Sequence, residues 1–145
     1  MRLVELQRLY ESGRSLYDSD FEHYYMSEAC AYFAIALHET FGYGLAILWD
    51  EANFYNEESE IPVLAHVFAT DGKRAIDVKG VRSVNDIKRD YYDLEQPVVD
   101  SVGLSELKTY MNDSDDYPLM PYSEEEINEA KKIIAENPQR YSKHP

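Results

Sequence analysis

Residues 61–80, IPVLAHVFATDGKRAIDVKG, contain two strand-like runs on either side of Asp71-Gly72. An Asp-Gly pair between such runs is a strong signal for a β-hairpin. A two-residue turn there places His66 directly opposite Asp77, with Cβ atoms about 4.5–5.5 Å apart on one face of the sheet. This register predicts a hydrogen bond between the two side chains. Loops of about three to five residues are also common and would shift the pairing.

A strongly apolar helix is predicted upstream of the hairpin. Ser27 is suited to cap its N-terminus, and Glu28 suits the positive end of the helix dipole. The run ACAYFAIALHETF then extends to Gly42, a residue typical of helix C-termini. Because this run is apolar on most sides, we expect a buried central helix with Cys30 in its first turn.

The remaining elements follow from hydrophobic periodicity and capping residues. We expect a helix over 2–12, a buried strand over 44–49, an exposed acidic excursion over 50–61, a helix capped by Ser83 over 84–94, helical turns over 104–111, and a helix between Ser123 and Asn137. Their order predicts an α+β fold in which the central helix packs on a small antiparallel sheet, flanked by N- and C-terminal helices.

The chain length of 145 residues fits a single domain. Within residues 1–145 we expect a core over about 27–80 and a C-terminal helical extension over 83–138. The oligomeric state is left open by the sequence.

Charge and composition exclude several classes of protein. The net charge of −14 argues against binding to nucleic acid or an anionic membrane. It either favours a cationic protein or peptide partner or simply keeps the protein soluble. No apolar run reaches the roughly 18–20 residues that cross a bilayer. With one cysteine there is no internal disulfide, and we expect a reducing, cytoplasmic location. No motif predicts a cofactor or metal; His23 and His38 lack a third ligand in register.

The position of Cys30 suggests chemistry. The helix dipole and a nearby imidazolium both favour a thiolate, and backbone N–H groups at the helix start could hold an oxyanion. Cys30, His66 and Asp77 would then be the nucleophile, the base and the residue that orients the base. The alternative is purely structural, with Cys30 a small core residue and the His66–Asp77 pair of little consequence.

Two stretches resemble a known group of enzymes. CAYFAIALHETFG, residues 30–42, resembles the cysteine-bearing central helix of papain-like and transglutaminase-like thiol enzymes, with its Cys-x-x-Phe-Ala pattern and following glycine. HVFATDGKRAIDVKG, residues 66–80, resembles their histidine strand, turn and aspartate strand. The chain is also similar to small phage and mobile-element proteins with this compact core. The likeness covers about residues 27–80.

The resemblance implies that Cys30 is the nucleophile, His66 the general base and acid, and Asp77 the residue that orients His66. It also implies action on an amide bond by peptide or isopeptide cleavage, glutamine deamidation or transamidation. The glutamine that papain-type enzymes carry before the cysteine is missing here. Tyr24 and Tyr25 stand in that region and could substitute for it.

A second hypothesis belongs to a different class. The chain could be an acidic protein that blocks a basic surface of another protein, with an enzyme-like fold that is catalytically unused and of phage origin. Its contacts would be the acid-rich stretches 50–60 and 111–126.

Overall fold

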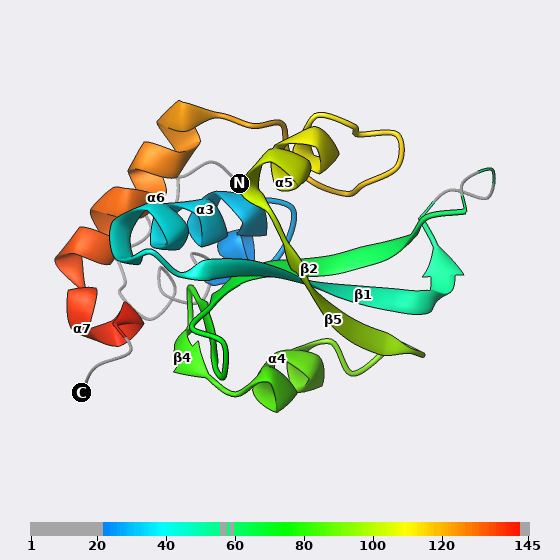
Figure 1. Ribbon diagram of the computed structural model, residues 1–145, viewed down its shortest axis with the longest axis horizontal. Helices are drawn as coiled ribbons and strands as arrows, with labels where there is room; N and C mark the ends of the chain where they lie inside the picture. Colours follow the sequence, from blue (N-terminus) through cyan, green and yellow to red (C-terminus); the bar gives the residue numbers. More distant parts are fainter. Residues whose placement is uncertain (1–21, 56–57, 59, 143–145) are drawn as a thin grey trace, which may run out of the picture.

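The computed structural model describes residues 22–55, 58 and 60–142, in which a five-stranded antiparallel sheet carries helices on both faces (Figure 1). The strand order is β4-β3-β2-β1-β5. The strands are β1 (Gly44–Phe54), β2 (Pro62–Thr70), β3 (Ala75–Asp77), β4 (Gly80–Arg82) and β5 (Pro97–Val102). The helices are α3 (Cys30–Phe41), α4 (Val84–Asp90), α5 (Leu104–Met111), α6 (Glu124–Glu136) and α7 (Pro138–Tyr141). The predicted α+β class is confirmed, while the helix expected over 2–12 lies outside the described residues.

The two faces of the sheet bury separate apolar clusters, as the alternation of side chains along a strand requires. On β1, Leu45 and Ile47 join the larger cluster with α3, whereas Ala46 and Leu48 pack with Ile87 of α4. Helix α6 packs on α3, so that α3 lies between the sheet and another helix (Figure 1). This placement explains why every residue from Cys30 to Leu37 is buried.

Helix boundaries agree with the capping residues. Ser83 and Asp86 form a full capping box at the start of α4, and Ser123 accepts a hydrogen bond from the backbone N–H of Glu126 at the start of α6. At the end of α3, Gly42 adopts the left-handed conformation with φ of 77°. The predicted cap at Ser83 and the predicted helix end at Gly42 are confirmed.

The predicted helical extension over 83–138 is wrong in one part. Residues 97–102 form β5, which pairs with β1 along the sheet edge, with Leu45 opposite Val102 and Asp50 opposite Pro97. This strand begins with a proline and is only half buried, as suits an edge strand. Its pattern is therefore too weak to distinguish it from a loop.

The hairpin between β2 and β3 has a longer loop than predicted. The ladder pairs Ala69 with Ile76 and Thr70 with Ala75, so four residues, 71–74, form the connection. The Asp71 carboxylate accepts hydrogen bonds from the backbone N–H groups of residues 73 and 74, which closes the loop before the ladder begins. The two-residue turn, and with it the direct pairing of His66 with Asp77, is wrong.

None of the helices in the described part of the chain combines the length and the apolar character that crossing a membrane requires.

Candidate functional site

Cys30 is the first residue of α3. The N-cap is Ala29, which makes no side-chain capping bond, so the prediction that Ser27 caps this helix is wrong. Ser27 lies within a turn over 26–29 that precedes the helix, and its hydroxyl donates instead to the backbone oxygen of His23 at 3.0 Å. The thiol nevertheless lies at the positive end of α3.

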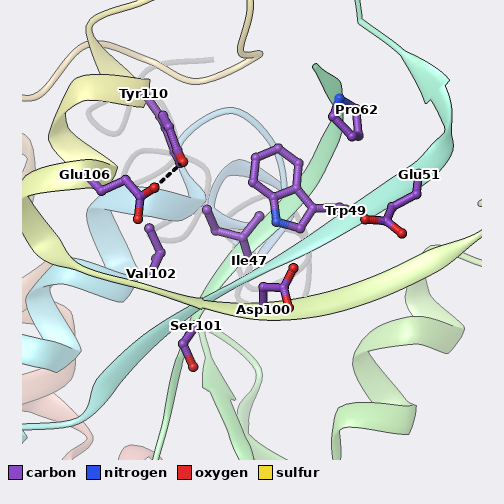
Figure 2. A pocket seen from close by; sticks show the side chains of 9 residues that line it. All are labelled: Ile47, Trp49, Glu51, Pro62, Asp100, Ser101, Val102, Glu106 and Tyr110. Carbon is purple, nitrogen blue, oxygen red and sulfur yellow. Dashed lines mark hydrogen bonds between the residues drawn. The ribbon is translucent and has the colours of Figure 1, made fainter. Parts of the chain in front are cut away.

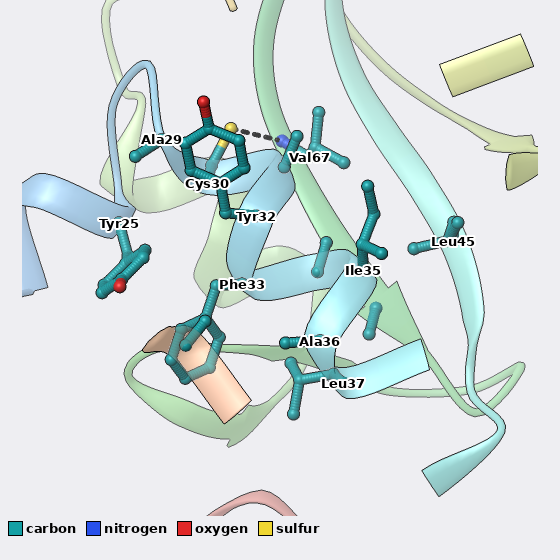
Figure 3. Close-up of a cluster of buried hydrophobic side chains, with 14 of the residues drawn as sticks. Tyr25, Ala29, Cys30, Tyr32, Phe33, Ile35, Ala36, Leu37, Leu45 and Val67 are labelled. Atoms are coloured by element: carbon teal, nitrogen blue, oxygen red, sulfur yellow. Dashed lines mark hydrogen bonds between the residues drawn. The ribbon is translucent and has the colours of Figure 1, made fainter. Parts of the chain in front are cut away.

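The thiol reaches the sheet where β2 has no partner on β3. The β2–β3 ladder pairs only Ala69 and Thr70, and beyond it the backbone N–H of Val67 donates to Cys30 Sγ at 3.3 Å (Figure 3). Cys30 therefore takes the place beside β2 that a residue of a longer β3 would occupy. This brings the thiol next to the strand that carries His66.

His66 and Asp77 are in contact. His66 Nε2 lies 3.1 Å from Asp77 Oδ2, and the two side chains are 0% and 3% exposed. The observed register is shifted by two residues from the predicted one, and a shift of two keeps every side chain on the same face. His66 and Asp77 are thus diagonal neighbours, which are still within reach of each other.

Three donors converge on the Asp77 carboxylate. Besides His66, the Arg82 guanidinium donates at 2.9 Å and the backbone N–H of Lys79 donates at 2.9 Å. Burial raises the pKa of Asp77, but the hydrogen bonds and the positive charges of His66 and Arg82 outweigh it and lower this pKa overall. Asp77 is therefore an anion that fixes the ring of His66.

The second ring nitrogen of His66, Nδ1, is not used in the contact with Asp77. Nδ1 is buried and has no hydrogen-bond partner among the described residues. Burial disfavours the imidazolium, yet Asp77 and the neighbouring Cys30 raise the pKa of His66 to about 9. The ring is thus held by Asp77 through Nε2, is protonated at neutral pH, and is close enough to Cys30 for this residue to raise its pKa.

Two further residues belong to this cluster and were missed from the sequence. Arg82 joins Asp77 to Asp90, donating to the latter at 2.7 Å. Tyr91 follows α4, and its ring centroid lies 5.3 Å from that of His66. Neither residue belongs to a motif. They reach the site because β4 pairs with β3 and because α4 packs on the face of the sheet that is opposite to α3.

Tyr91 connects the ring of His66 to the segment before the thiol. Its hydroxyl donates to the backbone oxygen of Met26, in the turn before α3, and so ties the end of α4 to the segment that precedes the thiol. Burial and electrostatic interactions with Cys30 and Asp77 raise the pKa of Tyr91, which keeps the phenol a donor. Since Cys30 is only 2% exposed, the thiol is closed off from solvent in this structure.

Removing the Tyr91 hydroxyl is expected to increase the fraction of molecules in which the Cys30 thiol is accessible to solvent. Tyr91→Phe keeps the ring but loses one hydrogen bond, worth about 1 kcal/mol, which corresponds to an open population about fivefold larger. Alkylation of Cys30 by iodoacetamide, followed by mass spectrometry, should speed up by about that factor. Tyr110→Phe is the matched control, because its hydroxyl also makes one hydrogen bond, to Glu106 on α5. Equal rates in the two variants would contradict a role for Tyr91 in keeping the thiol from solvent.

The other residues considered for the site lie elsewhere. The Tyr24 hydroxyl donates to Glu126 at 2.9 Å, and the Tyr25 ring packs against Phe33 in the core (Figure 3). The Cys30 backbone N–H donates to the oxygen of Ser27 at 3.0 Å. The structure thus brings neither tyrosine to the thiol, and one of the N–H groups at the helix start, where an oxyanion was expected to bind, already has a partner.

No metal-binding cluster is present among the described residues. No group of three or more histidine, cysteine, aspartate or glutamate side chains there could hold an ion. His38 instead bonds the backbone oxygen of Tyr43 through Nδ1 at 2.6 Å, at the end of α3.

Comparisons with protein-family models, with curated proteins and with solved structures gave no match to this chain. The likeness to papain-like and transglutaminase-like enzymes therefore rests on the short motifs in residues 30–42 and 66–80, and the function it implies is a proposal.

Proposed function

We propose that this protein is a thiol enzyme that acts on an amide bond through Cys30, His66 and Asp77. One observation carries the proposal. A fully buried imidazole is fixed by a carboxylate through Nε2, its other nitrogen has no hydrogen-bond partner among the described residues, and the only thiol of the chain accepts a hydrogen bond from the backbone N–H of the next residue, Val67. A histidine oriented in this way is the usual partner of a catalytic cysteine.

In the first step the sulfur of Cys30 attacks the carbonyl carbon of the amide. A carbon–sulfur bond forms, and the carbon–nitrogen bond breaks as the His66 imidazolium gives its proton to the departing nitrogen. The products are a free amine, or ammonia from a glutamine side chain, and an acyl group bound to Cys30 as a thioester.

In the second step neutral His66 removes a proton from water or from an acceptor amine, which attacks the thioester carbon. The carbon–sulfur bond breaks and the thiolate returns, with His66 again protonated. Water yields a carboxylic acid and an amine yields a new amide. Asp77 takes no proton in either step; it keeps the ring oriented and favours the imidazolium.

Turnover is expected to fall as the pH rises through about 9. The pKa of His66 is raised to about 9, so the imidazolium that protonates the leaving nitrogen is present below this pH and is lost above it. The measurement is kcat/KM against pH. A rate that still increases above about pH 9 would contradict the role of His66 as the acid.

Three assays on one preparation test the proposal. Release of peptides from casein reports peptidase activity, ammonia release from a glutamine peptide reports deamidation, and incorporation of a fluorescent amine into casein reports transamidation. We expect at least one signal to exceed that of Cys30→Ala by about 1,000-fold or more, because the thioester cannot form without sulfur.

The control for this experiment is a variant that keeps the thiol and has an unrelated exposed change, Glu136→Gln on α6. It should retain the wild-type rate. If all three signals equal those of Cys30→Ala and the thiol is also unreactive towards iodoacetamide, the proposed function is wrong.

The working location and partners belong to the same proposal. A catalytic thiol without a disulfide partner suits a reducing compartment, so we propose the cytoplasm, with a protein or peptide as substrate. The alternative of an acidic inhibitor has less support. Part of its expected contact surface, 111–126, packs on α3, where the Tyr32 hydroxyl donates to the oxygen of Pro121.

A further inference from the structure

A pocket separate from the Cys30 site lies between β1, β5 and α5 (Figure 2). Its volume is about 620 Å³, within the range of about 300–1,000 Å³ that is usual for ligand sites. Ile47 and Trp49 of β1 line it and pack with the α3 cluster, which places the pocket on the α3 face of the sheet. His66 lies on the opposite face, with Phe68 and Tyr91.

The lining of the pocket is strongly acidic. Glu51 of β1, Asp100 of β5 and Glu106 of α5 all contribute to it, and none of the described lysine or arginine residues does. Within the described part of the chain, no ion pair neutralises any of these three carboxylates. Three like charges gathered around one cavity favour a cation inside it.

The same pocket has an aromatic wall. Trp49 lies among the carboxylates, and its ring centroid is 6.1 Å from that of Tyr110 (Figure 2). The Tyr110 hydroxyl donates to Glu106 at 2.6 Å, which orients one of the carboxylates. The face of an indole attracts cations, and guanidinium groups stack on it. The carboxylates and the Trp49 ring thus each favour a cation in this pocket, for independent reasons.

We propose that this pocket binds the arginine or lysine side chain of a polypeptide partner. A polypeptide is the favoured source of the cation because β5 is the outermost strand of the sheet, so an extended chain can approach along its edge. Trp49 supplies the stacking surface, and the three carboxylates supply the opposite charge. The proposal does not depend on the function of Cys30.

Trp49 also provides the measurement, because it is the only tryptophan of the chain. Its fluorescence is followed during titration with the capped peptide Gly-Gly-Arg-Gly-Gly and with the same peptide carrying citrulline, a neutral analogue of arginine. We expect a saturable change with the arginine peptide and none with the citrulline peptide. Affinity should fall about tenfold between about 50 mM and 500 mM salt.

Matched charge variants locate the binding. Asp100→Asn and Glu51→Gln, both at exposed positions, should each weaken binding by about fivefold or more, while Glu136→Gln on α6 should leave it unchanged. Equal binding of the citrulline peptide, or equal weakening by all three variants, would overturn the proposal. Agmatine, the free cation, should bind more weakly than the peptide; equal affinity would overturn the assignment to a polypeptide.

Discussion

Replacement of Asp77 by alanine is expected to lower the free energy of unfolding by about 3–5 kcal/mol, the usual cost of breaking a buried ion pair. The Asp77 carboxylate is 3% exposed and accepts hydrogen bonds from His66, Arg82 and the backbone of Lys79. Without it, the charge of Arg82 loses a buried partner and His66 loses the group that favours its protonated form. Urea unfolding followed by circular dichroism measures the change.

The control is Asp90→Ala. Asp90 bonds the same guanidinium and also Lys79, but its side chain is 25% exposed. Water can replace its contacts, so the expected loss is about 1 kcal/mol or less. Similar losses for the two variants would show that Asp77 is no more than a surface partner of Arg82.

Replacement of His66 by glutamine is expected to slow alkylation of Cys30 about 100-fold at about pH 6.5. The amide of glutamine can still donate to Asp77, but it carries no positive charge towards the thiol. An ordinary cysteine is only about 1% thiolate at this pH, which sets the size of the expected effect. The readout is the mass of the single alkylated cysteine against time in iodoacetamide.

His38→Gln is the matched variant, since this histidine lies on α3, the helix that also carries the thiol, but bonds the backbone of Tyr43. It should react like the wild type. Near-ultraviolet circular dichroism confirms that both variants are folded, because unfolding exposes the thiol and increases its reactivity. An unchanged rate in folded His66→Gln would exclude activation of Cys30 by His66.

The contact between His66 and Asp77 was predictable even though the turn was not. The sequence indicates a hairpin around Asp71-Gly72, and any even shift of its register keeps both side chains on one face. The structure has four loop residues instead of two because the Asp71 carboxylate binds the following backbone N–H groups. The contact between His66 and Asp77 therefore depends on the alternation of side chains between the two faces of a strand and not on the exact length of the turn.

The parts that could not be predicted depend on packing between distant segments. Arg82 and Tyr91 have no pattern of their own, and they join the site only because β4 and α4 fold back beside β3. The edge strand β5 is half buried and lacks a clear alternation. The acidic pocket needs β1, β5 and α5 together, so no single stretch of sequence shows it.

The most direct test of the account is the rate of Cys30 alkylation by iodoacetamide in the folded protein between about pH 6 and 8, measured by mass spectrometry. If His66 keeps the sulfur as a thiolate, the rate should change by less than about threefold across this range. An unactivated thiol would instead react about tenfold faster for each pH unit, whatever fraction of the molecules is open. This result would contradict the claim that His66 and Asp77 activate Cys30.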